Sequence, residues 1–370
     1  MSNSKNIFVT QPSLPPIADF ERNLREIWES KLLTNQGEFC QRLETALSDF
    51  LGVDHISLFC NGTMALMTAL NVANVTKEVI TTPYTFVATA HALVWNKLTP
   101  VFVDVDPDTL NLDPTKVEKA ITSETSAILP VHVYGHPCDI DAFDRLAREY
   151  NLKVIYDAAH AFGVDCHCGS LLQHGDFSVL SFHATKVFNT AEGGAIICRD
   201  EQTKREVDKF KNFGFAAETQ VDSTGLNGKM SELAAALGCS QLPFFSDNRE
   251  KRRLIDQRYR QRLMHVRGIT CQDFSSVKYP NYGYFPIFVE TNYPLSRDEL
   301  YEKFKSHGIY VRRYFYPLVS NFSAYQGSNL SKSGNLTVAE EAARKVICLP
   351  IYADLELDLV EKVIDVISLN

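Results

Sequence analysis

The sequence predicts an α/β fold built on a largely parallel sheet with crossover helices. Short apolar runs typical of buried strands alternate with helical patterns from residue 56 to residue 198, as in βαβ units. One of these runs ends on Asp157 and another runs into Asn61-Gly62-Thr63. With 370 residues, 45% of them hydrophobic, the chain can bury a large core and form one large and one smaller domain.

The elements are expected in the following order. Residues 1–20 are polar and rich in proline, which favours an extended N-terminal arm able to pack on a partner subunit. A large domain, residues 21–245, would start with the helical pattern of residues 19–50. Within it we expect strands at 56–59, 78–81, 99–103, 153–157, 176–182 and 192–198, and helices from Thr63 and Thr85. A small C-terminal domain, residues 246–370, would contain a charged helix over 246–266, strands at 282–289 and 310–314, and helices from Ser296 and Leu357.

Composition excludes several classes of function. The formal net charge is −8 and the isoelectric point is about 5.7, which argues against nonspecific binding of nucleic acid. We find no transmembrane run, internal repeat or secretory signal, so the nine cysteines are expected to be reduced thiols in a cytoplasmic protein. The stretch Cys166-His167-Cys168 lacks a second ligand pair at zinc spacing, and no metal site is predicted.

Lys186 is the leading candidate for a catalytic residue. It lies between the apolar runs 176–182 and 192–198 and is flanked by hydroxyls, by His183 and by a Gly-Gly step. Burial would lower the pKa of its amine, and a neutral amine attacks carbonyl carbons. The segment therefore suggests a Schiff-base lysine, and an exposed loop lysine is the alternative.

Asp157 ends the expected strand 153–157, and the carboxyl ends of strands carry ligand groups in open α/β sheets. Enzymes that use pyridoxal 5'-phosphate (PLP) need a carboxylate against the pyridine nitrogen, because the protonated ring is the electron sink. Asp157 can supply that carboxylate, and His160 follows one helical turn later. The alternative is that Asp157 caps a following helix.

The segment Asn61-Gly62-Thr63 joins an expected strand to an expected helix. Backbone N–H groups at a helix N-terminus bind phosphate, and glycine allows close approach of the backbone. No Walker-type loop and no G-x-G-x-x-G motif occurs, which argues against an ATP or dinucleotide site.

The segments around Asn61, Asp157 and Lys186, in this chain order and at this spacing, resemble the sugar-nucleotide aminotransferases among fold-type I PLP enzymes. The resemblance covers about residues 10–365. It includes the further segments 82–90, 100–106, 130–137, 225–233 and 312–318. It implies a fold-type I PLP transferase whose large domain has a mostly parallel seven-stranded sheet flanked by helices, followed by a smaller C-terminal α+β domain.

The resemblance implies a role for each residue around the cofactor ring. Lys186 would form the Schiff base with PLP and later move a proton between the cofactor and the sugar carbon. Asp157 would pair with the pyridine nitrogen. His160 would approach the 3-oxygen of the cofactor, and Phe86 would cover one face of the ring.

The resemblance also assigns the phosphate and the substrate contacts. Gly62, Thr63 and Ser181 would hold the phosphate, together with Asn227 of the partner subunit, so that a homodimer with shared active sites is expected. The candidate substrate contacts are His183, Arg312, Arg313 and Tyr316.

The implied reaction is a ping-pong transamination. L-glutamate would convert PLP into pyridoxamine phosphate and leave as 2-oxoglutarate, after which a nucleotide-linked keto-sugar would take the amino group. The pattern Ser-Phe-His-x-x-Lys followed by Glu-Gly-Gly resembles relatives that aminate a 4-keto carbon. The resemblance is closest to enzymes that make dTDP-4-amino-4,6-dideoxy-D-glucose from dTDP-4-keto-6-deoxy-D-glucose for O-antigen in lipopolysaccharide.

Several alternatives stay open. The product could be the galacto epimer, and the substrate could be a 3-keto sugar, a UDP- or GDP-linked sugar or a cyclitol ketone. A PLP-dependent sugar dehydratase would carry histidine in place of Lys186. A non-catalytic regulator on the same fold would be expected to lack Lys186, Asp157 or the phosphate turn.

Overall fold

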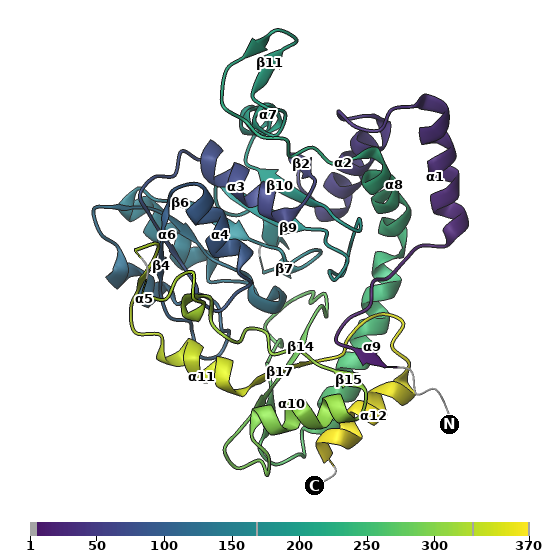
Figure 1. Cartoon of the computed structure of the whole chain (residues 1–370), viewed down its shortest axis with the longest axis vertical. Helices are drawn as coiled ribbons and strands as arrows, with labels where there is room; N and C mark the ends of the chain where they lie inside the picture. Colours follow the sequence, from purple (N-terminus) through teal and green to yellow (C-terminus); the bar gives the residue numbers. More distant parts are fainter. Residues whose placement is uncertain (1–5, 168, 328, 369–370) are drawn as a thin grey trace.

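The computed structural model describes residues 6–167, 169–327 and 329–368. Its main feature is an eight-stranded sheet at the centre of the molecule (Figure 1). Across the sheet the strands are β16 (Lys332–Ser333), β4 (Thr99–Phe102), β3 (Glu78–Thr81), β5 (Thr125–Leu129), β6 (Lys153–Asp157), β9 (Phe177–Ser181), β10 (Gly194–Cys198) and β2 (Ile56–Phe59).

The expected mostly parallel sheet is confirmed. All neighbours from β16 to β9 are parallel, and β10 runs antiparallel to both β9 and β2. The sheet has eight strands where seven were expected, because the two residues of β16, from the C-terminal part of the chain, pair with the edge strand β4.

Helices cover both faces of this sheet, which explains why its strands are apolar nearly throughout. One face packs against α2 (Glu38–Leu51), α5 (Pro114–Ala120), α6 (Ile140–Tyr150) and α8 (Glu232–Gln241). The other face packs against α3 (Gly62–Val72), α4 (Ala88–Trp95) and α7 (Glu201–Phe210). Along β6 the side chains alternate between these two cores, since Val154 and Tyr156 face the first and Ile155 faces the second.

The helical pattern of residues 19–50 forms two helices rather than one, α1 (Ile17–Ser30) and α2. Lys31 ends α1 in a left-handed conformation, with φ of 57°, and its N–H still bonds to the carbonyl of Ile27 at 2.9 Å. Helix α1 buries only Ile27 and lies along α8, where the amide of Asn23 donates to Ser240 at 2.9 Å.

A second hydrophobic core lies in the C-terminal part of the chain. It surrounds an antiparallel sheet of β13 (Ile269–Cys271), β14 (Phe285–Val289) and β17 (Val346–Leu349), together with α10 (Arg297–Ser306) and α12 (Leu357–Ser368). Helix α9 (Phe245–Leu263) joins the two cores, because its first residue packs in the first core and its later apolar residues pack in the second. Helix α11 (Thr337–Lys345) precedes β17.

The N-terminal segment lies against its own chain. Strand β1 (Ile7–Phe8) pairs in parallel with β15 (Ile309–Tyr310), which is shorter than the strand expected at 310–314. The carbonyl of Ser13 accepts a hydrogen bond from the amide of Asn189 at 3.1 Å. The first five residues of the expected arm lie outside the described residues.

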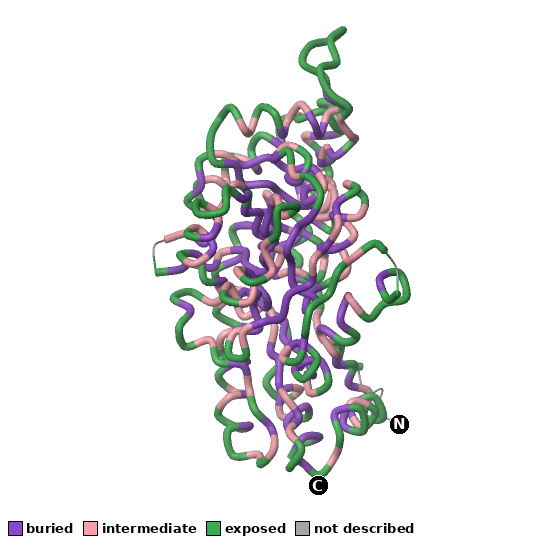
Figure 2. Tube along the Cα trace, turned by 90° about the vertical axis from the view of Figure 1, so that its left-hand side faces the viewer, coloured by how far each residue is buried: buried purple, intermediate pink, exposed green. Residues whose placement is uncertain are grey.

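Two small hairpins complete the structure. Strands β7 (Asp165–Cys166) and β8 (Gly169–Ser170) pair beside the large sheet. All residues of strands β11 (Phe215–Ala217) and β12 (Gln220–Val221) are exposed, and this hairpin stands clear of the body at the top of Figure 2. No helix in the described part of the chain combines the length and the apolar character that crossing a membrane requires.

Candidate active site

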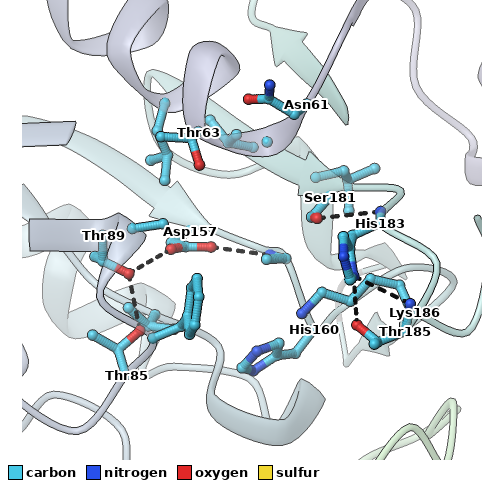
Figure 3. Close-up of a pocket in the computed structure, with 18 of the residues that line it drawn as sticks. Asn61, Thr63, Thr85, Thr89, Asp157, His160, Ser181, His183, Thr185 and Lys186 are labelled. Atoms are coloured by element: carbon cyan, nitrogen blue, oxygen red, sulfur yellow. Dashed lines mark hydrogen bonds between the residues drawn. The ribbon is translucent and has the colours of Figure 1, made fainter. Parts of the chain in front are cut away.

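A cavity of about 340 Å³ opens where β6 and β9 end, beside the first turn of α3 (Figure 3). Its walls come from the β2–α3 turn, the segment before α4, the segments after β6 and β9, and aromatic residues of the C-terminal part. The position follows the rule that ligands bind outside the carboxyl ends of the strands in open α/β sheets. The predicted residues that line it are Gly62, Thr63, Phe86, Asp157, His160, Ser181, His183 and Lys186.

Lys186 follows β9 and extends into the cavity, where its Nζ atom donates to the hydroxyl of Tyr284 at 3.2 Å. Burial lowers the pKa of Lys186 to about 8, and the negative charge of Asp157 opposes that shift. A substantial fraction of the amine is therefore neutral near pH 8, which is the state required of a nucleophile.

Asp157 enters the cavity from the end of β6 and is buried. Its Oδ2 accepts from the hydroxyl of Thr89 at 2.8 Å, and its Oδ1 accepts from the backbone N–H of Ala159 at 3.1 Å. Burial raises the pKa of Asp157, while these hydrogen bonds and the charge of Lys186 oppose the rise. The alternative that Asp157 caps a helix is wrong, because the chain after β6 makes tight turns and enters β7.

His160 is buried, and its Nδ1 accepts a hydrogen bond from the backbone N–H of Tyr134 at 3.2 Å. Burial holds the pKa of this imidazole well below its ordinary value, so the ring is neutral and its proton resides on Nε2. His160 can thus offer one N–H to an oxygen atom in the cavity. Its ring is stacked parallel to Phe315, with the centroids 5.9 Å apart.

The end of the cavity beside the first turn of α3 has the groups that suit an anion. Asn61 caps α3 by accepting from the backbone N–H of Met64 at 2.8 Å, and the other N–H groups of this first turn have no partners within the helix. Ser181 lies beside this turn, since a Cβ atom added to Gly62 would come within 3.0 Å of the Ser181 Cβ. Helix-terminal N–H groups and a hydroxyl together suit a phosphate.

At this end of the cavity, the positive potential comes mainly from the dipoles of backbone N–H groups and hydroxyls. Among the described residues that line the cavity, Lys186 is the only lysine or arginine. A phosphate would therefore depend on backbone N–H groups, hydroxyls and contacts from a second subunit.

Four predicted residues lie outside the cavity lining. Arg313 forms an ion pair with Asp298 at 2.7 Å and lies over the ring of Tyr316 at 5.1 Å. The backbone of Arg312 pairs with that of Cys348, and its side chain is exposed. Asn227 is exposed, forms a backbone bridge with Asn212 and is not among the residues that line the cavity of its own chain.

The structure adds site residues that were not predicted. Thr85 and Thr89 stand behind Asp157, and Tyr284 and Tyr314 form part of the wall near Lys186. The threonines are four positions apart in the segment that also holds Phe86, and this spacing is a local signal. No local pattern marks the two tyrosines. Cys168 of the Cys166-His167-Cys168 stretch lies outside the described residues, and among those described no three His, Cys, Asp or Glu side chains are grouped as metal ligands would be.

Comparison with known proteins identifies the family. The sequence profile of the DegT/DnrJ/EryC1/StrS aminotransferase family matches residues 17–368. The chain belongs to this family. Two relatives named dTDP-4-amino-4,6-dideoxy-D-glucose transaminase cover 98% of this chain and 98% of their own length. The relative from Shigella dysenteriae is 53% identical over 363 residues, and the one from Escherichia coli is 49% identical over 362.

The fold is also similar to those of solved aminotransferase structures. The structure of DesI in the presence of its TDP-sugar product has a TM-score of 0.95 and 34% identity, and the match covers 99% of this chain and 93% of that one. NtdA from Bacillus subtilis, solved with bound cofactor PMP, has a TM-score of 0.82 and 29% identity, covering 95% of this chain and 82% of that one.

The predicted enzyme class and cofactor are confirmed by these comparisons: the protein is a PLP-dependent transaminase. The residues in the cavity fit that cofactor. A lysine amine with a lowered pKa, a buried carboxylate and an anion-binding helix end meet in one space of suitable size.

Proposed function

We propose that the protein transfers an amino group from L-glutamate to C-4 of dTDP-4-keto-6-deoxy-D-glucose and so makes dTDP-4-amino-4,6-dideoxy-D-glucose. The observation that carries this proposal is the 53% identity, over nearly the full length of both chains, to a relative named for that amino sugar. The DesI structure, determined with its TDP-sugar product, supports the same class of substrate.

Four residues of the cavity would contact the cofactor ring, each with a different chemical group. When bound, PLP supplies an electron sink for the carbon that loses its proton. Lys186 would hold the cofactor through its amine and, whenever that amine is free, would take up and deliver a proton. Asp157 would pair with the ring nitrogen, His160 would donate from Nε2 to the 3-oxygen, and Phe86 would cover one face of the ring.

The phosphate would rest on the N-terminal turn of α3. Gly62 and Thr63 would contribute backbone N–H groups, and Ser181 would contribute its hydroxyl. Because Asn227 is exposed and does not line the cavity of its own chain, it is available to a neighbouring subunit, as expected for a homodimer with shared sites.

We propose an arm over residues 1–20, a large domain over 21–245 and a small domain over 246–370. The two hydrophobic cores that α9 joins support the boundary between the two domains. All eight cysteines in the described residues are free, which supports a reducing, cytoplasmic location. O-antigen synthesis is the process that we propose for the product.

Single-turnover amination tests the substrate. The pyridoxamine-phosphate form of the enzyme would be mixed with dTDP-4-keto-6-deoxy-D-glucose, and the product examined by NMR. An equatorial 4-amino group would support the proposal, and an axial one would replace it with the galacto epimer. Failure with this sugar, alongside turnover of a UDP-linked, GDP-linked or 3-keto sugar, would overturn the proposed substrate.

A further inference from the structure

We propose that Thr89, itself held by Thr85, is a positioning residue that keeps the Asp157 carboxylate ionised and fixed in the orientation in which it meets the cofactor ring. The proposal rests on the proposed role of Asp157 as the partner of the ring nitrogen. It goes further by assigning a function to a pair of hydroxyl groups behind that carboxylate.

The three side chains form one continuous chain of hydrogen bonds (Figure 3). The hydroxyl oxygens of Thr85 and Thr89 are 2.9 Å apart, and the Thr89 oxygen is 2.8 Å from Asp157 Oδ2. All three residues are buried, with 4%, 1% and 5% of their surface exposed. Water therefore does not replace a lost partner easily, and each of these bonds bears on the state of the carboxylate.

Both carboxylate oxygens have donors. An ionised carboxylate only accepts hydrogen bonds, so the Thr89 hydroxyl must donate to Oδ2 while the N–H of Ala159 donates to Oδ1. The Thr89 oxygen then has lone pairs free to accept from the Thr85 hydroxyl. Each link polarises the next, which strengthens the donation to Asp157.

The charge of the carboxylate needs this support. Burial favours the protonated acid, and the Thr89 hydroxyl is the strongest of the influences that oppose it. A protonated Asp157 could not act as the anionic partner of a ring N–H. A lysine or arginine at this position would neutralise the negative charge of Asp157. Threonine is a neutral donor, so it stabilises the carboxylate and leaves its charge available to the ring N–H.

The local fold explains how one segment performs two tasks. Thr89 is the second residue of α4, and Thr85 lies in the bend just before this helix, where the turn of the chain brings the two hydroxyl oxygens within 2.9 Å of each other. Phe86 lies between them in sequence and also lines the cavity. The segment thus presents its hydroxyls to Asp157 and its aromatic ring to the space above the cofactor.

The test uses pyridoxamine phosphate, which binds the apoprotein without a covalent bond to Lys186, and its analogue in which CH replaces the ring nitrogen. Dissociation constants for both probes would be measured by protein fluorescence between pH 6 and 9. Thr89→Val removes the hydroxyl at constant shape, and Thr89→Ser retains it. Thr68→Val is the matched control, because Thr68 is a fully buried threonine on α3 whose hydroxyl has no hydrogen-bond partner among the described residues.

We expect Thr89→Val to weaken binding of pyridoxamine phosphate about tenfold or more, the scale of one hydrogen bond to a charged group. The loss should grow as the pH falls, because the carboxylate of this variant protonates at a higher pH than that of the parent. The nitrogen-free analogue should lose almost nothing. Thr89→Ser and Thr68→Val should resemble the parent, and Thr85→Val should show a smaller loss in the same direction as Thr89→Val.

Equal losses for both probes would reduce Thr89 to a packing role and overturn the proposal, as would unchanged binding in Thr89→Val. Asp157→Asn separates this failure from a failure of the underlying assignment. If Asp157→Asn discriminates between the two probes and Thr89→Val does not, only the role of Thr89 is wrong. If neither variant discriminates between them, the role of Asp157 itself is wrong.

Discussion

At the scale of single residues, the state of the Lys186 amine is set by two opposing influences. Burial among aromatic side chains disfavours the ammonium ion, and the negative charge of Asp157 favours it. Burial prevails and brings the pKa of Lys186 to about 8, against an ordinary value of 10.5. The same cavity thus prepares a lysine for attack and supplies the carboxylate that restrains the shift.

This balance predicts the pH dependence of cofactor loading. In the apoprotein, the rate at which Lys186 reacts with saturating PLP should fall as the pH drops through about 8, because the protonated amine cannot attack. Asp157→Asn should move the midpoint to lower pH, since the charge that raises the lysine pKa is removed. Stopped-flow absorbance gives the rate, and borohydride reduction followed by peptide mass spectrometry identifies the modified lysine.

Lys186→Ala is the control for that experiment, and it should abolish both covalent labelling and transamination. A midpoint near pH 10 would show that the amine is solvated, contrary to the structure. Covalent labelling that persists at another lysine in Lys186→Ala would contradict the assignment.

At the scale of elements, the N-terminal turn of α3, where we propose that the phosphate binds, depends on close backbone contact between β10 and the β2–α3 turn. A Cβ atom added to Gly194 would lie 2.7 Å from both the Asn61 carbonyl carbon and the Gly62 nitrogen. Real Cβ atoms do not approach backbone this closely. Glycine is therefore required at position 194 because the Asn61–Gly62 backbone leaves no room for a side chain, and not because of its own φ angle.

Gly194→Ala should displace this turn and weaken binding of pyridoxamine phosphate by about tenfold or more, with a stability cost of about 1–3 kcal/mol. Pyridoxamine, which lacks the phosphate, should lose little affinity. Gly334→Ala is a suitable control, since its added Cβ would meet nothing closer than the Phe102 carbonyl at 4.0 Å. Dissociation constants and thermal unfolding test both variants, and an equal loss for the two ligands would rule out a phosphate-specific effect.

At the scale of the whole molecule, the cavity of one chain lacks one of the residues predicted to hold the cofactor phosphate. Asn227 lies on the exposed surface of its own chain, so a role at the phosphate requires a second subunit. In a symmetric dimer each site would contain Lys186 from one chain and Asn227 from the other.

Mixing subunits tests this arrangement. In a hybrid of Lys186→Ala with Asn227→Ala, one site carries both changes and the other carries neither. Random assortment should then restore about a quarter of the parental activity, because half of the dimers are hybrids with one intact site each. Activity equal to the mean of the two parent variants would show that each site is built from one chain.

Local patterns determined much of the fold and the centre of the site. Strands β2, β3 and β6 have the expected bounds, because short apolar runs between polar turns leave few alternatives. Asp157 was identified as a candidate because strand ends carry ligands in this class of sheet, and Lys186 because it lies between two apolar runs, where burial lowers the pKa of an amine. The alternative of a helix capped by Asp157 is wrong, since the Asp157 side chain bonds to the Ala159 N–H within a turn, and a turn of this kind resembles a helix start in sequence.

Only the tertiary structure decided which side chains surround Lys186 and Asp157. Thr89 meets Asp157 across 68 positions, and Tyr284 meets Lys186 across 98. It also placed β16 at the edge of the large sheet and Arg313 in an ion pair outside the cavity. The sequence by itself determined the chemistry that the protein can perform, because the reactive groups follow from residue types in local order. The partners that adjust those groups come from distant segments, and packing brings them together in a way that no local pattern records.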